Sequence, residues 1–227
     1  MQLITHFRTI VLSDLHLGSK GSKAKEVTEF LKQYKCDKLI LNGDIIDGWQ
    51  LKKYGNSWKK KHTAFFKTVL KMVAEYDTKV VYLRGNHDDF LDQVLPLKIG
   101  KYFSLRRDYI LKTATGKRYY VTHGDVFDSI TTHLKWLAYI GDIGYNLLLG
   151  INKLYNHYRN WRGLPYYSLS SQIKQKVKAA VNYISDFEEK LAELARSRNC
   201  DGIICGHIHQ PTIRQMGDVV YMNSGDW

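Results

Sequence analysis

The sequence has 227 residues, of which 44% are hydrophobic and 25% charged, and it contains only three prolines. This composition excludes an intrinsically disordered chain, and the length predicts one domain with a buried core, with room for an insertion. Lys and Arg outnumber Asp and Glu by 34 to 22, a formal net charge of +12, which indicates contact with something anionic.

Four short apolar runs, each stopping at polar residues or glycine, predict buried strands. The first covers residues 9–13 and stops at Asp14, and the second covers residues 39–41. The third and fourth cover residues 80–83 and 203–205. Runs of this length without polar interruption are typical of strands that are covered on both faces.

Helical patterns lie between these strands. Apolar residues recur at helical spacing over residues 65–76 and 187–195, and residues 109–122 have the pattern of a β-hairpin that turns at Thr115-Gly116. Strands that alternate with helices predict an α/β fold built in layers.

One region, roughly residues 126–185, interrupts the alternation. It is rich in aromatic and basic residues and mostly helical in pattern, and we predict that it forms an inserted helical cap. Its most apolar stretch, residues 137–151, contains Asp142 and three glycines and is shorter than the roughly 20 residues that span a bilayer.

The cysteines and the N-terminal residues indicate the cellular compartment of the protein. Cys36, Cys200 and Cys205 are an odd number without paired spacing, so we expect no disulfide framework and a reducing environment. Residues 1–14 lack the long apolar stretch of a signal peptide. We therefore expect a cytoplasmic protein, either soluble or in contact with a membrane surface.

The positive charge is concentrated in two segments. Residues 51–70 contain six Lys and no acidic residue, and residues 129–178 contain seven Lys or Arg and one Asp. Basic and acidic residues balance in the rest of the chain. The two segments predict surfaces for an anionic substrate or an anionic lipid surface, and a solvated face is the alternative.

Residues of the kinds that bind metal ions follow each predicted strand. Because ligands of α/β sheets bind beyond the carboxyl ends of the strands, we expect these segments to converge. Alone, each segment is more simply explained as a turn or a core histidine, so the combination carries the prediction. The segments are Asp14-Leu-His16, Gly43-Asp44, residues 85–88, His123-Gly124 and His207-Ile-His209.

Nitrogen and oxygen ligands without thiolate favour Mn²⁺, Zn²⁺ or Fe over a structural zinc site. The candidate ligands are too many for one ion, so we predict two. Two metal ions lower the pKa of a bridging water and neutralise the charge on a phosphate undergoing displacement. The sequence therefore predicts hydrolysis of a phosphate ester.

These five segments resemble the motifs of the calcineurin-like metallophosphoesterases, from residue 8 to the C-terminus. The resemblance implies a two-sheet β-sandwich core flanked by helices, forming one domain over residues 1–227 that includes the cap. It also implies two divalent ions, Mn²⁺ first and Zn²⁺ or Fe as alternatives. The implied ligands are Asp14, His16, Asp44, Asn86, His123, His207 and His209.

The resemblance further implies three catalytic residues. Asp44 would bridge the two metal ions and hold the hydroxide that attacks phosphorus. His87 would contact the substrate phosphate and assist departure of the leaving oxygen, and Asp47 would orient His87. Asn86 would also contact the substrate.

Within this family the chain is most similar to the UDP-2,3-diacylglucosamine pyrophosphohydrolases of lipid A synthesis. The similar segments are residues 41–47, 88–90 and 122–125, together with the helical insertion. The similarity implies hydrolysis of an anionic nucleotide-sugar lipid to UMP and an acylated glucosamine 1-phosphate, with Mn²⁺, on the cytoplasmic face of the inner membrane. Better-known members have Arg where this chain has His87, which bears on the substrate.

Asp128, Lys174 and Lys178 are further candidates for substrate binding, from their positions in the sequence. Two other functions of the same fold remain open, a general phosphodiesterase or phosphatase and a metal-dependent nuclease. Aromatic residues interleaved with basic ones would suit single-stranded nucleic acid, although nucleic acid is not the favoured partner. A non-enzymatic scaffold ranks last because all seven candidate ligands are present. The oligomeric state is not predicted.

Overall fold

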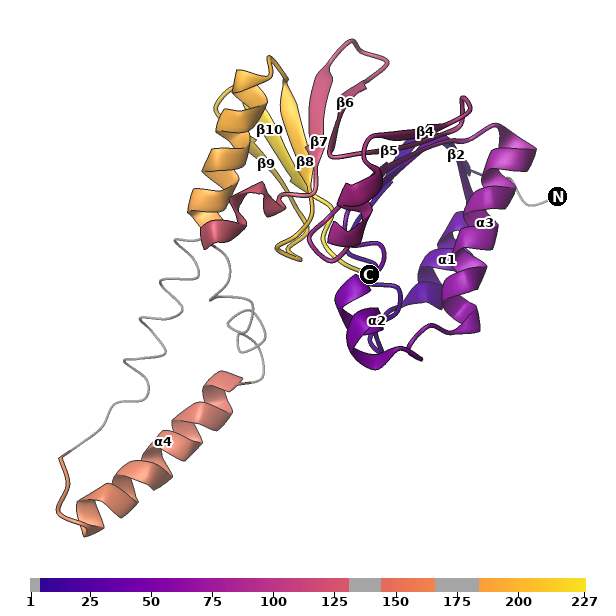
Figure 1. Cartoon of the computed structure of the whole chain (residues 1–227). Helices are drawn as coiled ribbons and strands as arrows, with labels where there is room; N and C mark the ends of the chain where they lie inside the picture. Colours follow the sequence, from indigo (N-terminus) through magenta and orange to yellow (C-terminus); the bar gives the residue numbers. More distant parts are fainter. Residues whose placement is uncertain (1–4, 131–143, 166–183) are drawn as a thin grey trace. The chain divides into compact units, whose positions relative to one another are not determined.

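Figure 1 shows the computed structural model of the chain, which describes residues 5–130, 144–165 and 184–227. Contacts within the chain divide it into two units. The core unit comprises residues 1–126 and 191–227, and the second unit comprises residues 127–190.

The core unit contains two five-stranded sheets, with strand orders β1-β2-β3-β5-β4 and β6-β7-β8-β10-β9. The inner strands of each sheet are parallel, and β4, β6 and β9 pair antiparallel to their neighbours at the edges. The strands are β1 (Thr5–Leu12), β2 (Tyr34–Asn42), β3 (Lys79–Leu83), β4 (Leu97–Ile99), β5 (Phe103–Arg106), β6 (Asp108–Lys112), β7 (Arg118–Thr122), β8 (Gly202–Cys205), β9 (Thr212–Met216) and β10 (Val219–Asn223).

Helices connect several of the strands. Residues 184–197 are helical and lead into β8, and Leu191, Ala192 and Ala195 within them are buried. The labelled helices are α1 (Ala24–Gln33), α2 (Gly48–Tyr54), α3 (Lys60–Tyr76) and α4 (Gly144–Trp161), with short 3-10 helices η1 (Asp89–Val94) and η2 (Asp125–Ile130).

Helices α1 and α3 lie side by side along the first sheet (Figure 1). Val27 and Leu31 of α1 and Phe65 and Met72 of α3 are buried in one cluster with apolar side chains of β1, β2 and β3. Their spacing of four or seven residues places each set on one helical face, and burial of that face holds the helix on the sheet.

A second apolar cluster lies between the two sheets. Ile40 and Val81 of the first sheet share it with Val121 and Ile204 of the second. Strands β2 and β3 are therefore covered by helices on one face and by a sheet on the other, which is why they appear as uninterrupted apolar runs in the sequence.

This arrangement confirms the predicted α/β fold with two sheets and flanking helices. The predicted hairpin is β6 and β7, which pair from Asp108 opposite Thr122 to Lys112 opposite Arg118. Strand β1 begins at Thr5, before the apolar run, because the exposed residues at its start continue the pairing with β2.

The predicted cap, residues 126–185, falls largely in the second unit, where α4 is the longest described element. Leu154, Tyr158 and Trp161 of α4 are exposed. In the described residues, no helix combines the length and the apolarity needed to cross a membrane. That this segment covers the site stays a prediction.

Candidate metal centre

The predicted site residues lie on loops that follow strands of the core unit. Asp14 follows β1, Asp44 follows β2, Asn86 follows β3, His123 follows β7 and His207 follows β8. The parallel strands of each sheet end at the same edge, and the loops that follow them in the two sheets come together there.

The side chains of these loops form three overlapping groups. Within each group the possible ligand atoms lie within 4.8 Å of one another, and His16 and Asp44 each belong to two groups, so the groups are continuous. The groups are Asp14, His16 and His209; His16, Asp44 and His87; and Asp44, His123 and His207.

Asp44 lies at the centre of this cluster and is 2% exposed. Its Oδ2 atom is 3.3 Å from His123 Nε2 and 3.9 Å from the Nε2 atoms of both His16 and His87. Its Oδ1 atom accepts the backbone N–H of His87 at 2.8 Å. Burial raises the pKa of Asp44, but the nearby His123, His87 and His16 lower it by more than burial raises it. The pKa therefore lies below its ordinary value. An ionised carboxylate shared by several imidazoles suits a bridging ligand.

His123 is fully buried, and its ring is fixed by a backbone carbonyl. The Nδ1 atom lies 3.0 Å from the carbonyl oxygen of Asn42 and donates to it, which directs Nε2 toward Asp44. Burial lowers the pKa of His123, but Asp44 and Asp14 outweigh burial and raise it to about 10. Apart from this contact with Asp44, Nε2 has no hydrogen-bond partner among the described residues. His123 Nε2 and the Asp44 carboxylate beside it therefore need a cation between them, which can be a proton or a metal ion.

Asp14, His16 and His209 form the outer part of the cluster. His209 Nε2 lies 3.2 Å from Asp14 Oδ1 and 3.4 Å from His16 Nε2, so three potential ligand atoms face one another. Burial raises the pKa of Asp14, but His123 and His209 lower it below its ordinary value. On its other side, His209 Nδ1 lies 3.6 Å from Asp226 Oδ2. The donor set of carboxylate and imidazole fits a divalent first-row ion.

Asp47 lies within hydrogen-bond distance of His87. Its Oδ1 atom lies 3.1 Å from His87 Nδ1 and also accepts the backbone N–H of Gln50 at 3.0 Å, which caps α2. The start of the helix therefore fixes the carboxylate that orients the imidazole. The indole of Trp49 lies against the same imidazole, with 4.0 Å between ring centroids.

Asn86 lies beside His207 on the inner side of the cluster. The amide Oδ1 is 3.1 Å from His207 Nδ1, and Nδ2 is buried without a hydrogen-bond partner. A neutral amide oxygen can ligate a metal ion without adding charge to a cluster that already contains two carboxylates.

The backbone is left-handed at most of the predicted ligands. Among the described residues, seven that are not glycine have positive φ, and five of the seven belong to the cluster. Each such residue costs about 1–3 kcal/mol, which the surrounding hydrogen bonds must offset. Such strain concentrates at functional sites, and residue types do not reveal it. The five are Asp14, His16, Asp44, His207 and His209.

Two glycines allow carboxylates to approach the backbone. A Cβ at Gly85 would overlap Asp44 Oδ1, and a Cβ at Gly206 would overlap Asp14 Oδ2. Any side chain at these positions would displace the carboxylates, which explains why glycine accompanies the ligand residues in the motifs.

Comparison with known proteins identifies the family. A model of the calcineurin-like phosphoesterases matches residues 7–211. The chain belongs to this family. It is therefore a metallophosphoesterase, a hydrolase with a dinuclear centre that uses divalent metal ions.

Individual relatives of this metallophosphoesterase are distant. The UDP-2,3-diacylglucosamine hydrolase of Blochmanniella pennsylvanica (strain BPEN) is 25% identical over 215 residues, which cover 91% of this chain and 81% of that protein. Among solved structures, Vps29 of Chaetomium thermophilum is similar with 10% identity and a TM-score of 0.49, covering 96% of this chain and 70% of that one. The phosphopantetheinyl hydrolase of Mycobacterium tuberculosis is similar with 15% identity and a TM-score of 0.42, covering 98% and 90%.

Sequence reasoning missed several residues that support the metallophosphoesterase site. The carbonyl of Asn42 fixes His123, and Arg84 pairs with Asp125 and, at 3.0 Å, with Asp92. Arg84 directly precedes the loop of Asn86, and Asp125 closely follows His123, so this ion pair joins a loop of the first sheet to one of the second. Their adjacency to the motifs was the available signal.

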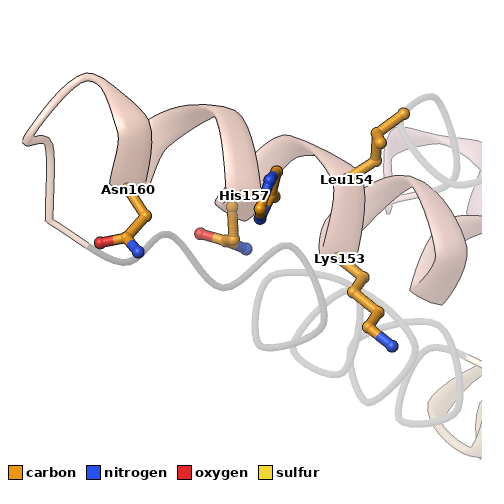
Figure 2. Close-up of a pocket in the computed structure, with 5 residues that line it drawn as sticks. Lys153, Leu154, His157 and Asn160 are labelled. Carbon is orange, nitrogen blue, oxygen red and sulfur yellow. The ribbon is translucent and has the colours of Figure 1, made fainter.

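Three predicted substrate residues are not placed. The side chain of Asp128 and the whole of Lys174 and Lys178 lie outside the described residues. A hollow of about 420 Å³ lies along α4. Its lining residues Lys153, Leu154, His157 and Asn160 are labelled in Figure 2. None of the described residues that line this hollow has a carboxylate.

Proposed function

We propose that this metallophosphoesterase hydrolyses the pyrophosphate bond of UDP-2,3-diacylglucosamine, adding water across it to release UMP and the acylated glucosamine 1-phosphate. The chemistry rests on one observation, the buried Asp44 carboxylate that faces three imidazoles. The substrate rests on the relative that acts on UDP-2,3-diacylglucosamine and on the residues that resemble its family.

The proposed ligand roles are those that the family resemblance implies, and the grouping of the carboxylate and imidazole side chains supports them. When bound, the two ions, Mn²⁺ in our proposal, would supply Lewis acidity to the phosphate oxygens and lower the pKa of water. The residues proposed to hold the outer ion are Asp14, His16, Asp44 and His209, and those proposed to hold the inner ion are Asp44, Asn86, His123 and His207.

His87 is the proposed proton donor for the leaving phosphate oxygen. Its Nδ1 atom is engaged by Asp47 at 3.1 Å, which leaves Nε2 to face the space beside Asp44. A carboxylate behind an imidazole fixes the orientation of the ring. In this proposal Asp47 orients His87, and His87 Nε2 delivers the proton as the phosphorus–oxygen bond breaks.

The remaining parts of the proposal concern the lipid and the membrane. The lysines of residues 51–70 would attract the anionic substrate and an anionic membrane surface. The exposed apolar residues Leu154, Tyr158 and Trp161 of α4 would contact acyl chains. Residues 126–185 would form the cap, in which Asp128, Lys174 and Lys178 would contact the substrate.

The test is a product assay with the purified chain and Mn²⁺. UDP-2,3-diacylglucosamine is expected to yield UMP and the acylated sugar phosphate by mass spectrometry, and UDP-N-acetylglucosamine, which lacks the two long acyl chains, is expected to react at least 10-fold more slowly. Asp44→Ala serves as the inactive control. Equal rates on the two substrates, with rapid hydrolysis of bis-p-nitrophenyl phosphate, would instead support a general phosphodiesterase. Cleavage of single-stranded nucleic acid would support a nuclease.

A further inference from the structure

Asp88 is a buried carboxylate with no role in the chemistry described above. Its side chain is completely buried, and among the described residues no Lys, Arg or His forms an ion pair with it. Burying a carboxylate without an ion-pair partner costs free energy. We therefore ask which part of the structure its hydrogen bonds stabilise.

Three donors surround this carboxylate. Its Oδ2 atom accepts the backbone N–H of Ile45 at 3.1 Å, and its Oδ1 atom accepts the backbone N–H of Ile46 at 2.8 Å and the hydroxyl of Tyr82 at 3.0 Å. In the hydrogen bonds that Asp88 makes with the described residues, both of its oxygens act as acceptors.

The donors and the acceptor belong to the two central ligand loops. Ile45 and Ile46 directly follow Asp44, whose φ of +52° places it in the left-handed region. Asp88 directly follows His87 and lies two residues after Asn86, on the loop after β3. One side chain therefore joins the backbone that carries the shared carboxylate to the backbone that carries the amide ligand and the proton donor.

We propose that Asp88 is a positioning residue that sets the separation between Asp44 and the Asn86–His87 loop, and thereby metal affinity and turnover. Two further bonds join the loops at this separation, His87 N–H to Asp44 Oδ1 at 2.8 Å and Gly48 N–H to the His87 carbonyl at 3.1 Å. The inference rests on the proposed ligand roles of Asp44 and Asn86.

The test compares Asp88→Asn with Asp89→Asn. Asp89 is exposed and adjacent in sequence, so its substitution makes the same chemical replacement outside the contacts between the ligand loops. In Asp88→Asn the new amide hydrogens face an N–H donor, which pushes the two loops apart. Tyr82→Phe removes one donor and leaves the backbone bonds intact.

The measurements are Mn²⁺ affinity by calorimetry, and kcat and KM on bis-p-nitrophenyl phosphate, at a temperature where circular dichroism shows each variant folded. We expect Asp88→Asn to weaken Mn²⁺ binding about 10- to 100-fold and to lower kcat about as much, with KM changed less than about 3-fold. Tyr82→Phe should show a loss of about 3-fold in Mn²⁺ affinity, and Asp89→Asn none.

A folded Asp88→Asn variant with unchanged Mn²⁺ affinity and kcat, even if its melting temperature falls, would show a merely structural residue and overturn the inference. If Asp88→Asn does not fold, unchanged Mn²⁺ affinity in Tyr82→Phe overturns it instead. Failure of the wild type to cleave UDP-2,3-diacylglucosamine would refute the proposed substrate alone, because these readouts need only Mn²⁺ and a simple diester.

Discussion

The two ends of the ligand cluster differ in burial. At the inner end, Asp44, His123 and His207 are at most 4% exposed, whereas at the outer end the side chain of His209 is 41% exposed. The inner imidazole of His123 is held by a main-chain carbonyl, and the outer imidazole of His209 lies near the exposed carboxylate of Asp226. We infer that the inner end holds its ion tightly and that the outer end exchanges its ion and admits the substrate.

The largest expected effect comes from the residue that the two ends share. Asp44→Ala removes the carboxylate that faces His16, His87 and His123, so both ions should be lost and kcat should fall about 10⁴-fold or more. Metal content by inductively coupled plasma mass spectrometry and turnover of a simple diester check this. Asp89→Ala is the control, and a variant at Asp44 that keeps both ions would refute the shared ligand.

Removing an inner imidazole and removing an outer imidazole should have different effects on metal binding. His123→Ala should lose one ion irrecoverably and lower kcat about 10³-fold, because the buried cavity that remains cannot recruit a replacement ligand. His209→Ala should weaken the other ion about 10- to 100-fold, and millimolar Mn²⁺ should restore much of its activity. Equal rescue of both variants would contradict the difference between the ends.

His87 lies between the two ends of the cluster. Replacing it tests whether this residue is a proton donor or a metal ligand. His87→Asn should lower kcat about 10²-fold on a substrate with a poor leaving group while both ions stay bound. Esters of p-nitrophenol, whose leaving group needs no proton, should lose much less activity. Loss of metal from this variant would make His87 a ligand, because it belongs geometrically to the middle group.

The pH dependence of metal binding should also differ between the inner and the outer end of the cluster. The pKa of His123 is raised to about 10, so at pH 7 the metal-free protein carries a proton there that an ion must displace. At the outer end burial chiefly lowers the pKa of His16, whereas Asp14 outweighs burial and raises the pKa of His209, but to a smaller extent than that of His123. Affinity for the inner ion should rise about tenfold per pH unit from pH 7 toward pH 10. Calorimetry in buffers of different ionisation enthalpy would detect the released proton.

The stability of the metal-free protein should change with pH in the opposite direction. Because the folded pKa of His123 lies above its unfolded value of about 6.5, its stabilisation is complete below that value and disappears as the pH rises toward 10. The melting temperature of metal-free protein should therefore decline over this interval. The Mn²⁺ form should lack this decline, and a parallel decline in both forms would contradict the prediction.

The positions of the candidate ligands could be predicted from the sequence because parallel strands deliver their ends to one edge. Asp14, Asp44 and His123 each follow a buried apolar run, and that order alone brought them together. The edge strands β4 and β9 were missed, since Ile99 and Ile213 are exposed and no apolar run marks them.

The supports of the site were harder to predict for a different reason. The Asn42 carbonyl that fixes His123 is a main-chain group, and Asp88 accepts from main-chain N–H groups, so no pairing of residue types indicates either contact. The left-handed backbone of the ligands likewise arises from the packed loops. A sequence shows which side chains are available, whereas these contacts depend on how the backbone turns.

The most direct test of the account is the anomalous diffraction of manganese in crystals of the Mn²⁺-loaded protein. The account predicts two peaks that both contact Asp44, one beside His123 and one beside His209, and after brief soaking in chelator only the peak beside His209 should weaken. A single peak, a second peak away from Asp44, or equal loss of the two peaks would contradict it.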